Sequence, residues 1–111
     1  MTEVFLSLGS NIEPEKNILE AVKLLSKGVR ILKISKVYLT EPLLGRTQPK
    51  FYNCVVKVET DIPPDKLKFE VLRNIEKKLG RKRTRDKFAP RTIDIDIAVY
   101  GNLHLSTKDL I

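Results

Sequence analysis

The sequence has 111 residues, of which 41% are hydrophobic and 32% are charged, which is the size and balance of one globular domain. A formal net charge of +7 indicates an anionic partner, either a phosphorylated small molecule or a nucleic acid. The single cysteine excludes an internal disulfide and a cysteine-rich zinc site, and no apolar run approaches the ~20 residues of a membrane span, so we expect a cytoplasmic protein.

The N-terminal quarter predicts a strand followed by a helix. Residues Val4–Gly9 are mostly apolar, and Gly9-Ser10-Asn11 supplies the turn residues that end a short strand. Pro14 suits a first helical turn, and Gly28 is expected to close the helix in a left-handed conformation. The apolar stripe that should face the core comprises Ile18, Ala21, Val22 and Leu25.

Two further strands flank a long connection. Residues Val29–Tyr38 are rich in Ile and Val with lysines interleaved, which predicts a strand at one side of the sheet. Leu39–Lys50 has no periodicity, and a loop of about 12 residues in a compact domain is usually functional. Phe51–Glu59 predicts a third strand that carries Asn53. The Asn53 amide needs partners, which either neighbouring backbone or a heterocyclic ligand with an amide-like edge would supply.

A second helix completes the order of elements. Pro63-Pro64-Asp65 begins it, Gly80 ends it, and its apolar stripe comprises Leu67, Val71, Leu72, Ile75 and Leu79. With one more strand after it, the order βαββαβ predicts an α+β, ferredoxin-like fold with an antiparallel sheet. Both helices then cover one face of the sheet, and the other face is available for an active site.

The last strand, Pro90–Tyr100, carries the candidate metal ligands. Its apolar set is expected to face the helices: Ile93, Ile95, Ile97 and Val99. Asp94 and Asp96 point the other way, about 6.6 Å apart along the strand, with no Lys or Arg between them. Two such carboxylates repel each other and suit Mg²⁺ held with waters and the phosphates of a substrate. The alternative is a solvated polar face on an edge strand.

The segment before this strand, residues 80–91, is strongly basic. Six positive residues and one negative residue predict an exposed loop. A polyphosphate bound to Mg²⁺ needs carboxylates for the ion and guanidinium groups for the phosphate oxygens, and here both kinds of group are adjacent in sequence. The alternatives are a solvated loop and a nucleic-acid-binding patch.

Three blocks of residues carry a resemblance to a known family. They are Leu8-Gly9-Ser10-Asn11; then Tyr38, Thr40, Pro42, Gln48, Pro49, Phe51 and Asn53; and then Gly80-Arg81, Arg83 and Pro90-Arg91-Thr92-Ile93-Asp94-Ile95-Asp96. In these blocks, the last of which is highly specific, the sequence resembles the 6-hydroxymethyl-7,8-dihydropterin pyrophosphokinases of folate biosynthesis, whose fold is ferredoxin-like. Family members continue with a Pro-His segment and an Arg followed by an aromatic residue, so this chain is expected to lack the usual C-terminal segment.

The resemblance implies an enzyme that transfers pyrophosphate from MgATP to the pterin hydroxymethyl group and releases AMP. Two Mg²⁺ ions would be held by Asp94 and Asp96. The catalytic residues would be Arg81, Arg91, Asp94 and Asp96. ATP would contact Glu76, Arg83, Arg91 and Ile97. The pterin would contact Thr40, Pro42, Leu43, Phe51, Asn53 and Phe88, the last of which stands where the family often has Trp.

We therefore predict a Mg²⁺-dependent pterin pyrophosphokinase that forms a single domain over residues 1–111 and has no membrane partner. One alternative is a remnant that binds pterin and nucleotide with little turnover. Another is a basic ferredoxin-like module that binds RNA on its open sheet face. Asp94 and Asp96 argue against RNA, because they would repel its phosphates unless a metal intervened.

Overall fold

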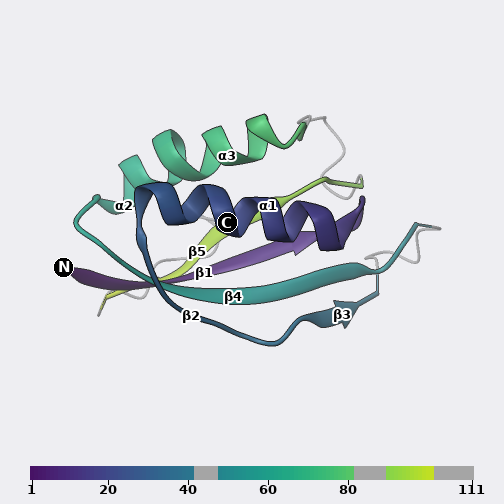
Figure 1. The fold of residues 1–111 in the computed structure, drawn as a ribbon, viewed down its shortest axis with the longest axis horizontal. Helices are drawn as coiled ribbons and strands as arrows, with labels where there is room; N and C mark the ends of the chain where they lie inside the picture. Colours follow the sequence, from purple (N-terminus) through teal and green to yellow (C-terminus); the bar gives the residue numbers. More distant parts are fainter. Residues whose placement is uncertain (42–47, 82–89, 102–111) are drawn as a thin grey trace.

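The computed structural model describes residues 1–41, 48–81 and 90–101. In these ranges a five-stranded antiparallel sheet is covered on one face by two helical segments (Figure 1). The strands are β1 (Thr2–Ser10), β2 (Arg30–Ile34), β3 (Tyr38–Thr40), β4 (Phe51–Thr60) and β5 (Asp94–Tyr100). Their order in the sheet is β2-β4-β1-β5, and β3 also pairs with β4. The predicted α+β class is confirmed.

The two helical segments follow the predicted apolar stripes. The first is α1 (Pro14–Gly28), and the second runs through α2 (Pro64–Lys66), the π-helical segment η2 (Leu67–Leu72) and α3 (Arg73–Lys78). No helix of the described ranges is long and apolar enough to cross a membrane. The prediction for Gly28 is wrong: it stays within α1, and the extended residue Val29 ends the helix. Gly80, with φ of 83°, ends the second segment as predicted.

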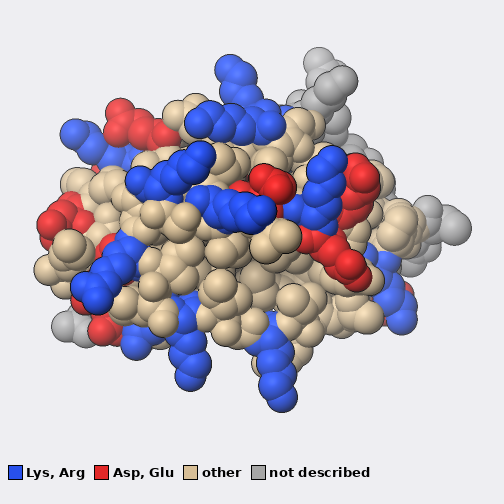
Figure 2. Space-filling view, in the orientation of Figure 1, with Lys and Arg blue, Asp and Glu red and all other residues tan. Residues whose placement is uncertain are grey.

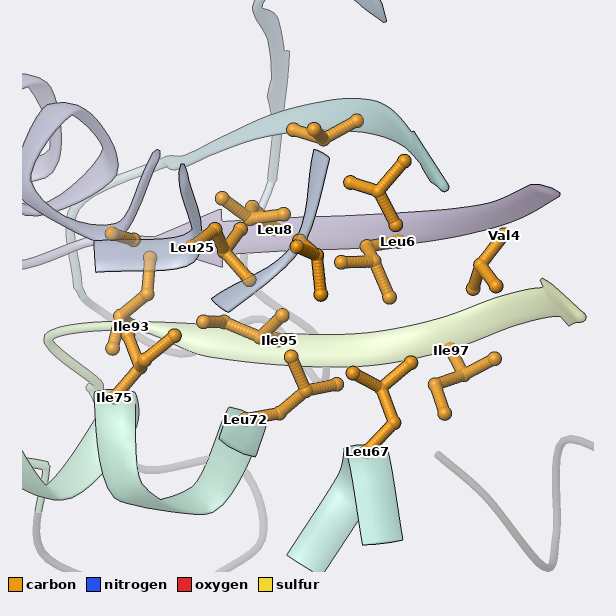
Figure 3. Close-up of a cluster of buried hydrophobic side chains, with 14 of the residues drawn as sticks. Val4, Leu6, Leu8, Leu25, Leu67, Leu72, Ile75, Ile93, Ile95 and Ile97 are labelled. Carbon is orange, nitrogen blue, oxygen red and sulfur yellow. The ribbon is translucent and has the colours of Figure 1, made fainter. Parts of the chain in front are cut away.

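The core lies between the sheet and the helices (Figure 3). Side chains from β1, the second helical segment, β5 and the residue just before β5 meet there with almost no exposure, among them Val4, Leu6, Leu8, Leu67, Leu72, Ile93, Ile95 and Ile97. Burying each such side chain stabilises the fold by about 1.5–3 kcal/mol. Because the isoleucines of β5 are held in this core, Asp94 and Asp96 project from the opposite face of the sheet.

The strand expected over Val29–Tyr38 is interrupted between β2 and β3. The reason is Ser35, whose Oγ accepts a hydrogen bond of 2.8 Å from the Val55 N–H, while its own N–H donates to the Val55 carbonyl, also at 2.8 Å. A side-chain oxygen therefore takes a place that a backbone carbonyl holds in a regular ladder. The interrupted strand lies at the edge of the sheet, as its interleaved lysines predicted.

Val99 does not face the core, contrary to the alternation expected from the sequence. Leu6 pairs with Ile97 but Phe5 pairs with Val99, so Ala98 is an additional residue in β5. Such a bulge reverses the faces of all residues after it. Tyr100 is consequently buried, and its hydroxyl donates to the Ile62 carbonyl at 2.6 Å.

Candidate functional site

A cluster of charged side chains joins the end of α3 to the start of β5. The Arg81 guanidinium lies 2.7 Å from a carboxylate oxygen of Glu76 and 2.6 Å from Oδ1 of Asp94. Arg91 lies 3.0 Å from Oδ2 of Asp94. The expectation of two unpaired aspartates is therefore wrong for Asp94. Arg81 reaches it from the end of the second helical segment, and Arg91 reaches it because the strand starts at Asp94 and not at Pro90 as predicted. These guanidinium groups are the kind that also binds phosphate oxygens.

Glu76 is the buried centre of this cluster. Its side chain is 3% exposed, and the same carboxylate oxygen that binds Arg81 also accepts the Ile95 N–H at 2.8 Å. Gly80 allows Arg81 to return over the helix end, since its positive φ is a conformation that other residues adopt at a cost. Glu76 thus links α3, Arg81 and β5 to one another. The predicted contact of Glu76 with ATP stays a prediction.

The two aspartates have opposite pKa shifts. Burial, the negative charge of Asp94, a hydrogen bond between the two carboxyl groups and the charge of Glu76 raise the pKa of Asp96 to about 7, although Arg81 opposes them. Burial also acts to raise the pKa of Asp94, but the Arg81 and Arg91 guanidinium groups outweigh it and hold that pKa below its usual value. Near neutral pH the pair therefore shares a proton that a bound cation would displace.

This pKa pattern predicts a pH dependence of stability in the metal-free chain. A raised folded-state pKa means that the folded chain binds the Asp96 proton more tightly than the unfolded chain. The resulting stabilisation is present at low pH and is lost as pH rises through about 7. We expect the urea midpoint, measured with EDTA, to fall between pH about 5 and about 8, and Asp96→Asn, which mimics the protonated acid, to remove most of that fall.

Asp61 provides the matched control, since it is a strongly exposed aspartate that follows β4 beside the N-terminus, at the opposite end of β1 from Gly9. Asp61→Asn should keep the pH dependence of the parent. A parent midpoint that stays level or rises over this range, or an Asp96→Asn variant that falls as steeply as the parent, would contradict the assignment.

A second group of polar atoms lies beside this cluster on the open face. The Asn53 amide nitrogen donates to Oγ1 of Thr40 at 2.8 Å, a side-chain partner that the sequence analysis did not consider. The neighbouring backbone considered there is also within reach, at the Phe51 and Tyr38 carbonyls, 3.4 and 3.5 Å away. A Cβ at Gly9 would lie 3.0 Å from Oδ1 of Asn53, which explains a glycine there. A cavity of about 150 Å³ runs past these residues, and its lining includes Gly9, Tyr38, Asn53, Cys54 and Asp94.

Phe51 and Arg91 lie between the two groups. The guanidinium carbon of Arg91 is 6.0 Å from the centroid of the Phe51 ring, within the range of a cation–π contact. Arg91 thus touches both Asp94 in the charged cluster and Phe51 at the start of β4. The cavity and this contact place the predicted pterin-side and phosphate-side residues next to each other.

The sequence analysis missed Asn11. It stands in the predicted turn and in the first resemblance block without an assigned role, yet it is 3% exposed and its side chain bonds to two distant segments of the chain. Its amide nitrogen donates to Oε1 of Gln48 at 2.6 Å and to the Pro49 carbonyl at 3.2 Å, and its Oδ1 accepts the Arg91 N–H at 2.8 Å. These partners are 37, 38 and 80 residues away, so no local pattern reveals them.

The remaining predicted site residues are placed as follows. Ile97 is 1% exposed in the core, on the face of β5 away from Asp94 and Asp96, so a nucleotide contact stays a prediction and would have to use its backbone. Within the described ranges, no three His, Cys, Asp or Glu side chains gather as a possible metal site. Four predicted contacts lie outside the described residues: Pro42, Leu43, Arg83 and Phe88.

The surface charge bears on the nucleic-acid alternative. Over the face seen in Figure 2, the Lys and Arg side chains of the described residues are interspersed with Asp and Glu. A nucleic-acid-binding face typically gathers its positive charges into a patch or stripe. The net charge of +7 is therefore not displayed on this face as one continuous basic surface.

The order of these residues matches a known protein family. The family described as 7,8-dihydro-6-hydroxymethylpterin-pyrophosphokinase (HPPK) matches residues 5–110. The chain belongs to this family. The matched range includes both groups of the site, from Gly9 to Asp96, so the HPPK resemblance seen in the three sequence blocks is confirmed.

Individual relatives agree with the HPPK assignment. A folic acid synthesis protein of Pneumocystis carinii is 46% identical over 97% of this chain, which covers 15% of that protein. The 2-amino-4-hydroxy-6-hydroxymethyldihydropteridine pyrophosphokinases of Aquifex aeolicus and Haemophilus influenzae are 38% and 37% identical over 97% and 92% of the chain. The chain spans 67% and 64% of these two proteins.

Proposed function

We propose that this chain transfers pyrophosphate from MgATP to the hydroxymethyl group of 6-hydroxymethyl-7,8-dihydropterin, giving AMP and the pterin diphosphate in folate biosynthesis. The observation that carries the proposal is the cavity with the Asn53 amide and Asp94 in its lining. An amide suited to a heterocycle and a carboxylate paired with two arginines thus share one small space. Membership of the HPPK family and the names of the two bacterial relatives support the same reaction.

The proposal includes the finer topology. We infer that β2 and β3 are one edge strand interrupted at Ser35, which makes the arrangement ferredoxin-like over a single domain of residues 1–111. The sheet order with β1 between β4 and β5, and both helical segments on one face, support this inference. The substrates would then lie across the open face.

The pterin end of the site uses β4 and its neighbours. The Asn53 amide and the Thr40 hydroxyl would pair with the polar edge of the ring, since among the described residues their mutual bond of 2.8 Å leaves the hydroxyl proton and the amide oxygen to bind a ligand. Phe51 would stack on the ring face. The resemblance adds Pro42, Leu43 and Phe88 to this end of the site.

The donor set on β5 fits Mg²⁺. Asp94 and Asp96 supply only oxygen atoms, and they share a proton near neutral pH because Arg81 and Arg91 form ion pairs with Asp94, whereas burial and the charge of Asp94 raise the pKa of Asp96. A divalent cation would replace that proton and let both carboxylates ionise. Asp94 and Asp96 would hold Mg²⁺, two ions by the resemblance, and the chemistry supplied there would be stabilisation of the negative charge on the ATP phosphates.

The arginines of the chain would then change partners. Arg81 and Arg91 neutralise Asp94 in the structure, and a cation at Asp94 would let their guanidinium groups turn to phosphate oxygens. In the transfer, the hydroxymethyl oxygen forms a bond to the β-phosphorus and gives up its proton to water. The bond from that phosphorus to the oxygen shared with the α-phosphate breaks, and AMP leaves with the electron pair. The arginines would hold the charge that develops on the transferred group and on the leaving AMP. The resemblance adds Arg83 to this set.

The test is AMP release from ATP with 6-hydroxymethyl-7,8-dihydropterin and Mg²⁺. We expect release that needs all three components, with an omission of the pterin as the control for simple ATP hydrolysis. Binding of both substrates without AMP release would identify a binding remnant instead. Binding of RNA with a steep salt dependence and no need for Mg²⁺ would identify the RNA-binding module.

A further inference from the structure

We propose that Asn11 is a positioning residue that sets the phosphate-side Arg91 and the pterin-side entry to β4 at a fixed distance from each other. The inference rests on the proposed function for the identity of the two ligands. It rests on the contacts of one buried amide for its geometry. Through these contacts the two halves of the site share a single support.

The orientation of the Asn11 amide follows from its partners. Its nitrogen faces the Pro49 carbonyl, which can only accept, and its oxygen faces the Arg91 N–H, which can only donate. Rotating the amide by half a turn would place its oxygen against the Pro49 carbonyl oxygen and its NH₂ group against the Arg91 N–H. A buried amide with all these contacts satisfied has one favourable arrangement, and it therefore specifies the separation of the segments it joins.

Arg91 is held at both ends of its backbone by the same residue. The Asn11 side chain accepts the Arg91 N–H at 2.8 Å, and the Asn11 N–H donates to the Arg91 carbonyl at 3.2 Å. The guanidinium that contacts Asp94 and Phe51 consequently starts from a fixed backbone position. On the other side, Pro49 stands two residues before Phe51, so the donor half of the Asn11 amide locates the start of β4.

Two substitutions of Asn11 distinguish the role of the amide donor from the role of the amide acceptor. Asn11→Asp keeps an oxygen acceptor for the Arg91 N–H but turns the donor toward Gln48 and Pro49 into a second oxygen, which meets oxygen partners. Asn11→Leu has a similar shape and loses both halves. The aspartate should therefore disturb the pterin side alone, whereas the leucine should disturb both sides.

The experiment uses the full chain and compares ligand affinities with amide hydrogen exchange. Asn11→Asp should weaken binding of 6-hydroxymethyl-7,8-dihydropterin about tenfold and leave the affinity for Mg²⁺ and a non-hydrolysable ATP analogue within about twofold. The Arg91 amide should stay protected from exchange. In Asn11→Leu both affinities should fall about tenfold, and the Arg91 amide should lose its protection.

Asn17 supplies the matched control. It is also a buried asparagine, 6% exposed, and its amide nitrogen donates to the Ile12 carbonyl at 2.6 Å; within the described ranges its side chain bonds to neither half of the site. Asn17→Asp should lower the urea midpoint as Asn11→Asp does and leave both affinities unchanged. A loss of pterin affinity without a loss of nucleotide affinity in Asn11→Asp, and no loss of either in Asn17→Asp, therefore distinguishes positioning from a general loss of stability.

Two results would overturn the inference. One is an Asn11→Asp variant that weakens both ligands equally, or neither. The other is an Arg91 amide that exchanges at the parental rate in Asn11→Leu. A parent chain that binds both ligands without releasing AMP would refute the proposed reaction, and the affinities and the exchange rates would still decide the role of Asn11.

Discussion

Replacing Asp94 or Asp96 by asparagine is expected to remove Mg²⁺-dependent ATP binding and to lower AMP release by about a hundredfold or more. Each change keeps the shape of the side chain and deletes one negative oxygen ligand of the proposed ion. A bound cation typically supplies several kcal/mol of charge stabilisation in the transition state, and about 1.4 kcal/mol corresponds to tenfold in rate. Titration calorimetry with a non-hydrolysable ATP analogue, with and without Mg²⁺, measures the binding.

The stabilities of these two variants should differ in direction. Asp96→Asn relieves the repulsion that raises the pKa of Asp96, so the free energy of unfolding should hold or rise near pH 8. Asp94→Asn removes the charge partner of Arg81 and Arg91, so the free energy of unfolding should fall. Asp61→Asn, on the exposed surface, should match the parent in both binding and stability. If either site variant binds MgATP like the parent, the metal assignment is wrong.

Glu76→Ala should cause the largest loss of stability among the variants considered. It leaves the Ile95 N–H without its acceptor and deprives Arg81, whose side chain is 10% exposed, of one carboxylate partner. Removing one member of a buried ion pair typically costs about 3–5 kcal/mol, a large part of the about 5–15 kcal/mol that stabilises a domain. Urea unfolding measures the change. An unchanged slope of the free energy of unfolding against urea concentration would show that the folded and unfolded states keep their compactness.

Glu76→Gln separates charge from hydrogen bonding at this position. Glutamine keeps an oxygen for the Ile95 N–H but loses the charge opposite Arg81, so we expect a smaller loss of stability than for alanine. Its effect on activity should come through the position of Arg81. Glu20→Ala, at an exposed ion pair with Lys23, is the control and should change stability by less than about 0.5 kcal/mol. A comparably small loss in Glu76→Ala would contradict the buried network.

Fold class and much of the site follow from local patterns. The period of two in β5 separates its isoleucines from Asp94 and Asp96, and the helical spacing of Leu67, Leu72 and Ile75 identifies the face that covers them. These patterns are readable because the direction of a side chain depends on the backbone conformation of its own segment. The family was inferred from the resemblance in the third block of residues, because no periodicity of the sequence indicates a family.

The tertiary structure decided which groups meet. The bulge at Ala98 depends on pairing with β1, and the interruption at Ser35 depends on a hydroxyl that reaches Val55 on the neighbouring strand. Glu76 meets Ile95, and Asn11 meets Arg91, only because α3 and β1 pack beside the start of β5. Alternation and helical stripes are local properties of the sequence, whereas ion pairs and buried amides depend on how closely distant segments approach, which packing determines.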